Sequence, residues 1–223
     1  MTVKQDVIDI CLNRGIPVVA CENHSSGRLT CPQIIQNVDT LEEEDFENIY
    51  RRIAGIPWDI ATTERCLIRE YGADGDLDRL FNLYSKPGIT DFMEGLFEYE
   101  KEREYQLNYI NYIYKIYDFG MWLVFDKYTG ELIGRAGIEV REDCIRDKEA
   151  ELGFCISPDR WRQGLAYEVC SAIIGLARDD YELDSLIARC DPDNLGSIRL
   201  LEKLGFTFER MLKDGDCLYH MVL

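Results

Sequence analysis

The stretch CISPDRWRQGLA, residues 155–166, decides the fold of this chain. Its first residues, Cys155-Ile156-Ser157-Pro158, are typical of a strand end, and Tyr167 to Asp180 is typical of a helix. The loop between them, Trp161 to Ala166, contains a glycine and lies at a strand-to-helix junction. Such a loop gathers unpaired backbone N–H groups at the positive end of a helix, where Arg162 adds a guanidinium. The stretch therefore predicts a phosphate-binding loop.

Composition limits the classes of protein that this chain can belong to. It has 223 residues, 46% of them hydrophobic, which is enough for one large domain or for one domain with a small extension. The formal net charge of −17 argues against a nucleic-acid partner, because basic surface is what holds a phosphate backbone. An acidic surface favours cationic or amine ligands, although many proteins are acidic for solubility alone.

Cysteine and histidine usage excludes two further kinds of site. The nine cysteines form no C-x-x-C pair, and their odd number does not suit a disulfide framework. The two histidines, His24 and His220, are far apart in sequence, so we expect no metal site. Free thiols suit a reducing cytoplasm. Without a signal peptide or an apolar run of eighteen residues, the sequence predicts a cytoplasmic protein with no membrane span.

Residues 1–60 are predicted to form a small N-terminal α/β extension. The apolar pattern indicates four elements, which are a helix over Val3–Arg14, strands over Ile16–Cys21 and Leu29–Val38, and a helix over Leu41–Ala54 that is capped by Asp39 or Thr40. The extension has no catalytic cluster that we can name. We interpret it as a docking or dimerisation appendage, so that a homodimer is one expected assembly. The alternative is a truncated half of a nucleotide-binding domain, although it lacks G-x-G-x-x-G.

Residues 62–223 are predicted to form the main domain. Periodicity gives the order β-α-α-β-β-β-α-β-α-β-β, with one long helix from Asp91 to about Tyr117. The long helix contains six tyrosines, most of which we expect to be packing residues. The order indicates an α/β (α+β) fold with a mixed, mostly antiparallel sheet and helices on both faces.

Three local patterns in this domain resemble the GCN5-related N-acetyltransferase (GNAT) superfamily. They are Glu149-Ala-Glu-Leu-Gly-Phe-Cys-Ile followed by Trp161-Arg-Gln-Gly-Leu-Ala, then Asn194-Leu-Gly-Ser197, and finally Leu201-Glu-Lys-Leu-Gly205-Phe206. The acetyl-CoA loop of the family is usually written Gln/Arg-x-x-Gly-x-Gly/Ala. Gly164 and Ala166 fit it, and Trp161 stands at the Gln/Arg position, which is typical of the branch that resembles ribosomal-protein-alanine N-acetyltransferases. The resemblance covers roughly residues 62–223.

The resemblance implies acetyl-CoA as the acetyl donor and no metal. It implies that the strand ending at Ile156 splays from the strand Ser185–Cys190, so that pantetheine pairs with its free edge. The loop amides would hold the pyrophosphate, and Asn194 would contact the pantetheine arm. The residues assigned to acetyl-CoA in this way are Phe154, Cys155, Ile156, Arg162, Gln163, Gly164, Leu165, Ala166, Asn194 and Ser197. A purely structural role for Asn194, as a helix N-cap, is the alternative, and the two roles are compatible.

Glu151 is the candidate general base. It lies on the central strand, where several members of the family carry a catalytic glutamate, and strand alternation places it on one face with Glu149. A carboxylate beside an apolar strand has a raised pKa, which suits a base near neutrality. The alternative for Glu151 is a salt-bridged surface glutamate, and for Glu149 we prefer that structural interpretation. A backbone N–H near Phe154 or Ile156 is the candidate oxyanion donor.

One departure from the family concerns the leaving thiolate. Many members protonate it with a tyrosine, and the matching position here is Leu201. The thiolate leaves unaided, or another group such as Tyr219 donates, although Tyr219 is better explained as a packed strand residue. A covalent acyl-cysteine on Cys155 or Cys190 lacks a histidine to activate it.

The sequence therefore predicts an N-acetyltransferase whose acceptor is a primary amine, on a small molecule or at a protein N-terminus. The acceptor pocket is expected between the helices within residues 77–117 and the turn at residues 213–216. The alternative is a non-catalytic acyl-CoA-binding or scaffold module that acts through the N-terminal unit.

Overall fold

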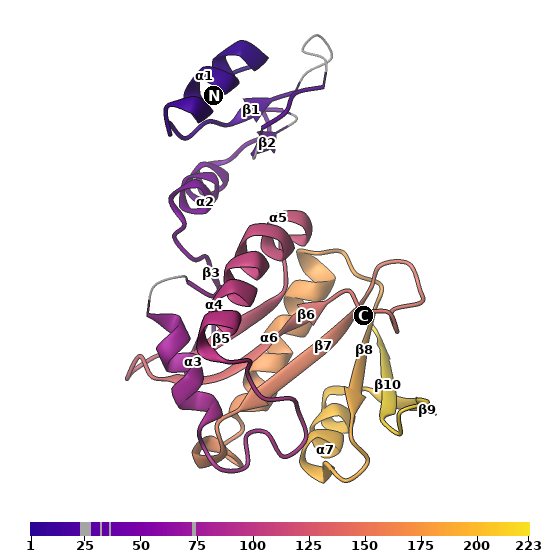
Figure 1. The fold of residues 1–223 in the computed structure, drawn as a ribbon. Coiled ribbons are helices and arrows are strands. Elements are labelled where there is room, and N and C mark those ends of the chain that lie inside the picture. Colours follow the sequence, from indigo (N-terminus) through magenta and orange to yellow (C-terminus); the bar gives the residue numbers. More distant parts are fainter. Residues whose placement is uncertain (23–27, 32, 36, 73–74) are drawn as a thin grey trace. The chain divides into compact units, whose positions relative to one another are not determined.

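The chain divides into two compact units, Met1–Trp58 and Asp59–Leu223. The computed structural model describes residues 1–22, 28–31, 33–35, 37–72 and 75–223, so that His24 lies outside the described residues. Figure 1 shows the elements of both units.

The first unit is a small α/β structure. Its elements are α1 (Gln5–Asn13), β1 (Ala20–Cys21), β2 (Ile34–Ile35) and α2 (Glu43–Ala54), and the two strands pair in parallel. Ile8 of α1 packs with Val18, Ala20 and Leu29 in its own apolar cluster. Both strands are much shorter than the predicted ones.

The predicted cap of the second helix was wrong. The N-cap of α2 is Glu42, and its carboxylate accepts from the backbone N–H three residues on, while the Asp45 side chain accepts from the Glu42 N–H at 2.8 Å. This reciprocal pair satisfies two N–H groups at the helix start, which a single side chain at Asp39 or Thr40 cannot do. The helix ends at Gly55, whose φ of 68° is left-handed.

The second unit is built on an eight-stranded sheet with the order β3-β4-β5-β6-β7-β8-β10-β9. Its strands are β3 (Asp59–Thr62), β4 (Cys66–Arg69), β5 (Met121–Asp126), β6 (Leu132–Glu139), β7 (Glu149–Ile156), β8 (Ser185–Cys190), β9 (Thr207–Met211) and β10 (Cys217–Val222). All neighbours pair antiparallel except β7 and β8, which are parallel. The predicted mixed, mostly antiparallel sheet is confirmed, with β3 as a strand that the sequence did not predict.

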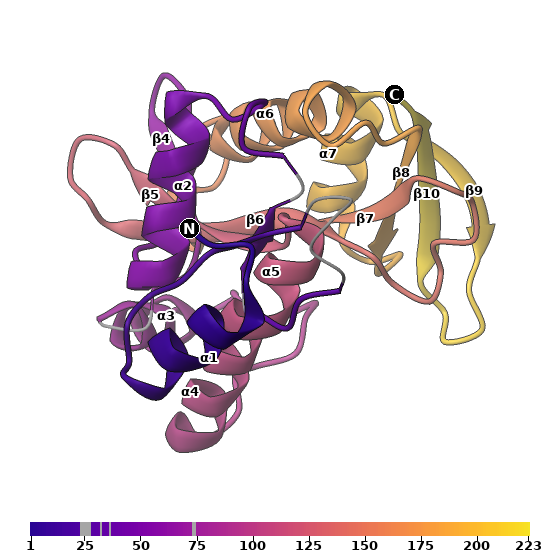
Figure 2. The same ribbon diagram turned by 90° about the horizontal axis from the view of Figure 1, so that it is seen from above.

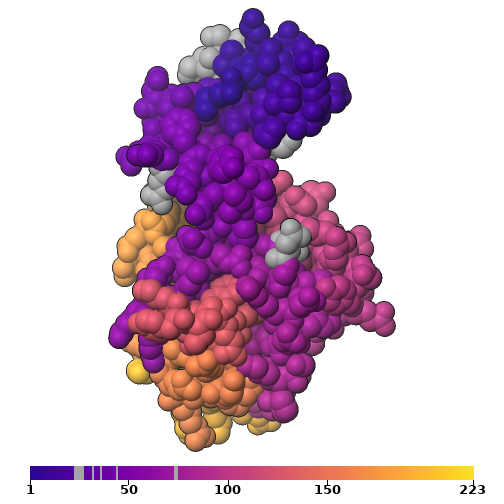
Figure 3. All heavy atoms as spheres, turned by 90° about the vertical axis from the view of Figure 1, so that its left-hand side faces the viewer, coloured from indigo at the N-terminus to yellow at the C-terminus, as the bar shows by residue number. Residues whose placement is uncertain are grey.

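Helices cover both faces of this sheet. They are α3 (Asp76–Tyr84), α4 (Tyr99–Asn108), the π-helical turn η1 (Tyr109–Ile113), α5 (Tyr114–Tyr117), the 3₁₀ turn η2 (Pro158–Arg160), α6 (Leu165–Asp179) and α7 (Leu195–Leu204). Figure 2 shows α6 and α7 on one side of the sheet and α3, α4 and α5 on the other. Figure 3 shows the surface formed by the α3 and α4 region.

The predicted helix from Asp91 to Tyr117 begins eight residues later, at Tyr99. Gly95 weakens any helix through this segment, because glycine loses more backbone entropy than other residues. The buried Glu102 carboxylate also accepts from the Phe97 N–H at 3.1 Å, which fixes the chain just before the helix. Residues 85–98 are therefore a non-helical connection. Its Ile89 packs in the core, while Phe92 and Phe97 are exposed and line a cavity.

The sheet opens between β7 and β8. The two strands pair only from Glu149 opposite Ser185 to Glu151 opposite Ile187, whereas β8 pairs with β10 along its whole length. Residues 152–156 of β7 therefore have no partner in β8. This is the splay that the resemblance implied, and it leaves a free strand edge in the middle of the sheet.

Candidate active site

A cavity of about 1060 Å³ opens over the splayed strands. Its walls come from the segment before α4, from β6 and β7, from the start of α6 and from the start of α7. Ten of the eleven residues that the sequence assigned to the site line this cavity, namely Glu151, Phe154, Cys155, Ile156, Arg162, Gly164, Leu165, Ala166, Asn194 and Ser197. Gln163 is not among the lining residues.

The free edge of β7 presents backbone groups to this cavity. The Ser157 N–H donates to the Ile133 carbonyl at 2.7 Å, so alternation directs the groups of residues 153 and 155 toward β6. Those of Phe154 and Ile156 point the other way, toward the gap. The Ile156 carbonyl is already occupied, because the indole N–H of Trp161 donates to it at 2.6 Å. The backbone N–H and C=O of Phe154 and the N–H of Ile156 are therefore available to pair with a ligand that lies beside β7 like an added strand.

The loop before α6 has the backbone of an anion site. Arg162 and Gly164 both have left-handed φ values, 60° and 79°. No side chain caps α6, so its first N–H groups are not satisfied by a capping residue. A side chain is tolerated poorly at Gly164 because of this φ, which explains the glycine.

A brace from far along the chain holds this loop in place. Arg65 donates to the Gln163 carbonyl at 2.8 Å and to the Glu168 carboxylate at 2.7 Å. Thr63 donates to the same carboxylate at 2.6 Å. The Gln163 backbone is therefore bound to Arg65, which directly precedes β4, and Gln163 lies away from the cavity.

Asn194 caps α7 as well as lining the cavity. Its side-chain oxygen accepts from the Ser197 N–H at 3.1 Å. The structural role that the sequence offered as an alternative is thus present. The Asn194 side-chain NH₂ donors are not used by this capping bond, so both roles are compatible.

Glu151 lies on the floor of the cavity, opposite Glu139 of β6. In the described part of the chain, no hydrogen bond or ion pair within 4.0 Å engages its carboxylate. Burial raises the pKa of Glu151 above its ordinary value, and the opposing pulls of Arg141 and Arg189 do not cancel this effect. A carboxyl of this kind is suited to accept a proton near neutral pH.

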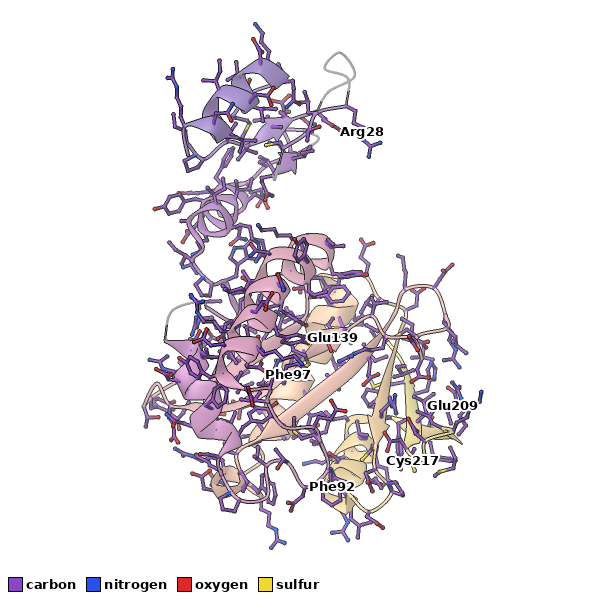
Figure 4. The ribbon with its side chains drawn as sticks, viewed as in Figure 1. Arg28, Phe92, Phe97, Glu139, Glu209 and Cys217 are labelled. Carbon is purple, nitrogen blue, oxygen red and sulfur yellow. The ribbon has the colours of Figure 1, made fainter. Side chains whose placement is uncertain are left out.

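Glu139 is engaged by its neighbours. The Tyr109 hydroxyl donates to it at 2.5 Å, and Arg141 donates to its other oxygen at 2.5 Å. Figure 4 labels Glu139 together with Phe92 and Phe97 of the connection before α4, and both phenylalanines also line the cavity.

Glu149 differs sharply from Glu151 although it lies two residues away on the same face. Its fully buried carboxylate accepts from the Ile145 N–H at 2.9 Å, from Arg146 at 2.8 Å and from the Ser185 hydroxyl at 3.0 Å. Burial alone would raise the pKa of Glu149, but these donors outweigh it and hold the pKa below the usual value. The structural interpretation of Glu149 therefore fits its surroundings.

The residues considered for a covalent acyl-cysteine or for protonating the leaving thiolate lie in surroundings that do not favour these roles. Burial raises the pKa of the Cys155 thiol, and it raises that of Cys190 to about 11, so neither is a ready thiolate. Leu201 is 1% exposed within the core. Tyr219 is buried and packs edge-on against Phe208, as a strand aromatic does, and it does not line the cavity.

Sequence reasoning missed several lining residues on α3, on β5, on or just after β6, and on β8. They are Tyr84, Met121, Arg135, Arg141 and Arg189. Arg135 was detectable in principle, because an arginine in the run Ile-Gly-Arg-Ala-Gly interrupts an otherwise apolar strand. Tyr105 also lines the cavity, so one of the six tyrosines of the predicted long helix faces this space. Within the described residues, no group of three or more His, Cys, Asp or Glu side chains is placed to hold a metal ion.

Comparison with known proteins identifies the family. The acetyltransferase (GNAT) domain family model matches residues 65–207. The chain is 30% identical over 158 residues to the uncharacterized N-acetyltransferase YoaA of Bacillus subtilis, covering 70% of this chain and 86% of the relative. It is 27% identical over 155 residues to the uncharacterized N-acetyltransferase p20 of Bacillus licheniformis, covering 69% and 85%.

Solved structures share the fold. A GNAT-family acetyltransferase from Bacillus anthracis aligns with a TM-score of 0.61 at 21% identity, covering 72% of this chain and 96% of that one. The ribosomal L7/L12 acetyltransferase RimL in complex with coenzyme A aligns with a TM-score of 0.64 at 18% identity, covering 74% and 97%.

The chain therefore belongs to the GNAT family, and it is an acetyltransferase. The alternative of a non-catalytic acyl-CoA-binding module is set aside. Helices long and apolar enough to cross a membrane do not occur in the described ranges.

Proposed function

We propose that this enzyme transfers an acetyl group from acetyl-CoA to a primary amine by direct attack in a ternary complex, with Glu151 as the general base. The observation that carries the proposal is the free edge of β7, which runs from the anion-binding loop to Glu151 within one cavity. The relative RimL, whose structure was solved with coenzyme A, supports the same donor.

The donor would lie along this edge. The N-terminal amides of α6, from Arg162 to Ala166, would hold the pyrophosphate. Pantetheine would pair with Phe154 and the Ile156 N–H as an added strand, while Asn194 approaches its other side. Ser197 would contact the adenosine-side phosphates or the backbone near them. The thioester would then lie near Gly153, two residues from Glu151.

The transfer requires three events. An ammonium first loses a proton to Glu151, directly or through water, because only the neutral amine is nucleophilic. The amine nitrogen then attacks the thioester carbonyl, and the resulting oxyanion is stabilised by a backbone N–H at Phe154 or Ile156. The carbon–sulfur bond finally breaks, and the attacking nitrogen gives its remaining extra proton to water or to the departing thiolate, so that a neutral amide and the CoA thiol result. No tyrosine at position 201 is needed for this step, since a thiol is acidic enough to leave as its anion.

Two measurements test this function. Isothermal titration should show acetyl-CoA binding, and the absence of binding at millimolar concentration would exclude the donor. A free-thiol release assay with a broad panel of amines should then show turnover. Binding without turnover on any amine would contradict the proposed transfer.

We also propose a cytoplasmic location for the enzyme and a role for its first unit. All nine cysteines are free thiols, which supports a reducing compartment such as the cytoplasm. For Met1–Trp58 we retain docking or dimerisation, and size-exclusion chromatography with light scattering tests the dimer.

A further inference from the structure

Arg135, in the middle of β6, carries a charge that no carboxylate among the described residues pairs with. Its Nε atom is buried and has no hydrogen-bond partner. Another guanidinium nitrogen reaches only the Tyr84 hydroxyl, at 3.4 Å. Throughout the described ranges, no carboxylate lies within 4.0 Å of this guanidinium. Because arginine stays protonated at all relevant pH values, the cavity wall contains an uncompensated cation.

The strand register places this cation at the opposite end of the floor from the carboxylates. Arg135 lies opposite Cys155, and Glu139 lies opposite Glu151. Four residues of strand separate the two levels, which is about 13 Å along the backbone. Gly153 lies between them, covered by the Met121 thioether, whose sulfur would be 3.2 Å from an added Cβ. The floor thus has an unpaired guanidinium at one end and, at the other, the unpaired Glu151 carboxylate beside the Glu139–Arg141 pair.

The residues around Arg135 do not supply a counter-ion. The buried Glu102 carboxylate also lines the cavity, but it already accepts from the Phe97 N–H at 3.1 Å and from the Gln106 side chain at 2.7 Å. Tyr84 stays a neutral hydroxyl, because burial raises its pKa to about 12. A buried cation without a partner is costly, and proteins retain one where a ligand completes the pair.

The phosphates of the donor are not placed to be that ligand. They belong at the N-terminus of α6, which lies across the sheet from α3, the helix that carries Tyr84 (Figure 2). Arg135 contacts Tyr84 and so faces the α3 side of the cavity. That side holds the space left for the acceptor.

We propose that Arg135 binds a carboxylate of the acceptor, so that the acceptor is an amino acid or a similar compound with both an amine and a free carboxylate. The inference rests on the proposed amine acetylation and gives it a substrate class. The planar guanidinium offers two parallel donors, which match the two oxygens of a carboxylate. Because about 13 Å of strand separates the two levels, the amine reaches toward Glu151 only when it is several bonds from the carboxylate, as in 6-aminohexanoate or at the side-chain amine of lysine.

Matched acceptor pairs test this proposal in the wild-type enzyme. The panel holds the standard L-amino acids with their α-amides, 6-aminohexanoate with 6-aminohexanamide, and the carboxylate-free amine spermidine. Thiol release should favour the carboxylate of an accepted pair roughly 10- to 100-fold in kcat/KM, as expected for a charged hydrogen-bonded pair. Turnover of amides or spermidine without a carboxylate preference would leave amine acetylation intact and overturn the substrate class.

Two variants then assign the preference to this residue. Arg135→Gln should reduce the carboxylate-to-amide ratio to about one and leave the acetyl-CoA affinity unchanged, whereas Arg135→Lys should retain part of the ratio because it keeps the charge. Arg178→Gln, on an exposed arginine of α6, is the control and should match wild type. A ratio that survives in Arg135→Gln, or a loss of acetyl-CoA affinity instead, overturns the assignment. Should Arg135→Gln not fold, the Arg135→Lys ratio and the wild-type pairs decide.

Discussion

The two sides of the cavity use their polar groups in different ways. On the cofactor side, several polar groups already have partners within the protein: Trp161 donates to Ile156, Asn194 accepts from Ser197, and Arg65 holds Gln163. On the acceptor side, Glu151 and Arg135 have no charged partner within 4.0 Å in the described residues. The acetyl donor is common to the whole family, so its binding groups can be fixed in advance by bonds within the protein. The acceptor side instead has unpaired charges that a ligand can engage.

The largest expected effect is on the acceptor side, at Glu151. We expect Glu151→Gln to lower kcat roughly 100-fold or more, because the variant cannot accept the proton of the ammonium. Acetyl-CoA affinity, measured by isothermal titration, should stay within twofold. An unchanged kcat would show that Glu151 is not the base, and its unpaired carboxylate would then no longer distinguish the acceptor side from the cofactor side.

The pH dependence sharpens the same point. Since the pKa of Glu151 is raised by burial, kcat/KM should fall as pH drops through that raised value, because the protonated carboxyl cannot act as a base. In Glu151→Gln this acidic limb should be absent. Rates measured from pH 5 to 9 in both proteins provide the check, and an identical limb in the variant would assign the titration to another group.

On the cofactor side, the backbone of the loop is the sensitive feature. Gly164→Ala places a side chain at φ 79°, which costs about 1–2 kcal/mol or shifts the loop, so the Kd for acetyl-CoA should rise roughly tenfold. Gly175→Ala within α6 is the matched control, since an added Cβ there meets nothing within 4 Å. Equal affinities in the two variants would show that the loop geometry does not matter for binding.

The two carboxylates on β7, Glu149 and Glu151, should differ in their effect on stability. Glu149→Gln replaces one of two acceptor oxygens with an NH₂ donor and removes the negative charge that pairs with Arg146, so it should lower the free energy of unfolding by about 2–3 kcal/mol at pH 7. The pKa of Glu149 is lowered, so its stabilisation is complete above the unfolded pKa and is lost as pH falls through the folded one.

Glu151→Gln should act in the opposite direction. The pKa of Glu151 is raised, so its ionised form is disfavoured in the folded state. At pH 8, where the wild-type carboxylate is ionised, the variant should therefore be more stable than wild type. At pH 4, where the carboxyl is protonated, this gain should be smaller. Urea titrations at both pH values measure the two variants. Destabilisation of Glu151→Gln at pH 8 would mean that its carboxylate has a structural partner.

The smallest effect is expected at Trp161. Trp161→Phe keeps an aromatic ring but loses the indole N–H that donates to Ile156, a bond worth about 1 kcal/mol. Acetyl-CoA affinity should therefore change by no more than about fivefold. A loss as large as that in Gly164→Ala would make the side chain, rather than the backbone, the main feature of the loop.

The cofactor side was largely predictable, because local patterns specify it. The strand Glu149–Ile156 and the helix after Gly164 are continuous segments whose period and glycine position can be recognised without knowing the rest of the fold. The acceptor side was not. Gly95 and the contact of Glu102 with Phe97 delay the start of the expected helix, and neither changes the i, i+4 pattern that suggested it.

Contacts between distant parts of the chain were the other obstacle. The brace between Arg65 and Glu168 joins residues 103 positions apart. The charge of Arg135 in the cavity could be suspected from its strand, but alternation alone does not say which face of the sheet opens into a cavity. Only the packing of α3 against β6 shows that.

The ring of Trp161 lies between the two sides of the cavity. It donates to the strand edge that receives the donor, and its Cη2 atom lies 3.5 Å from where a Cβ on Gly88 would be, in the connection that walls the acceptor side. The donor edge and the acceptor wall therefore share one side chain. A substitution that moves this ring changes the shape of both sides at once.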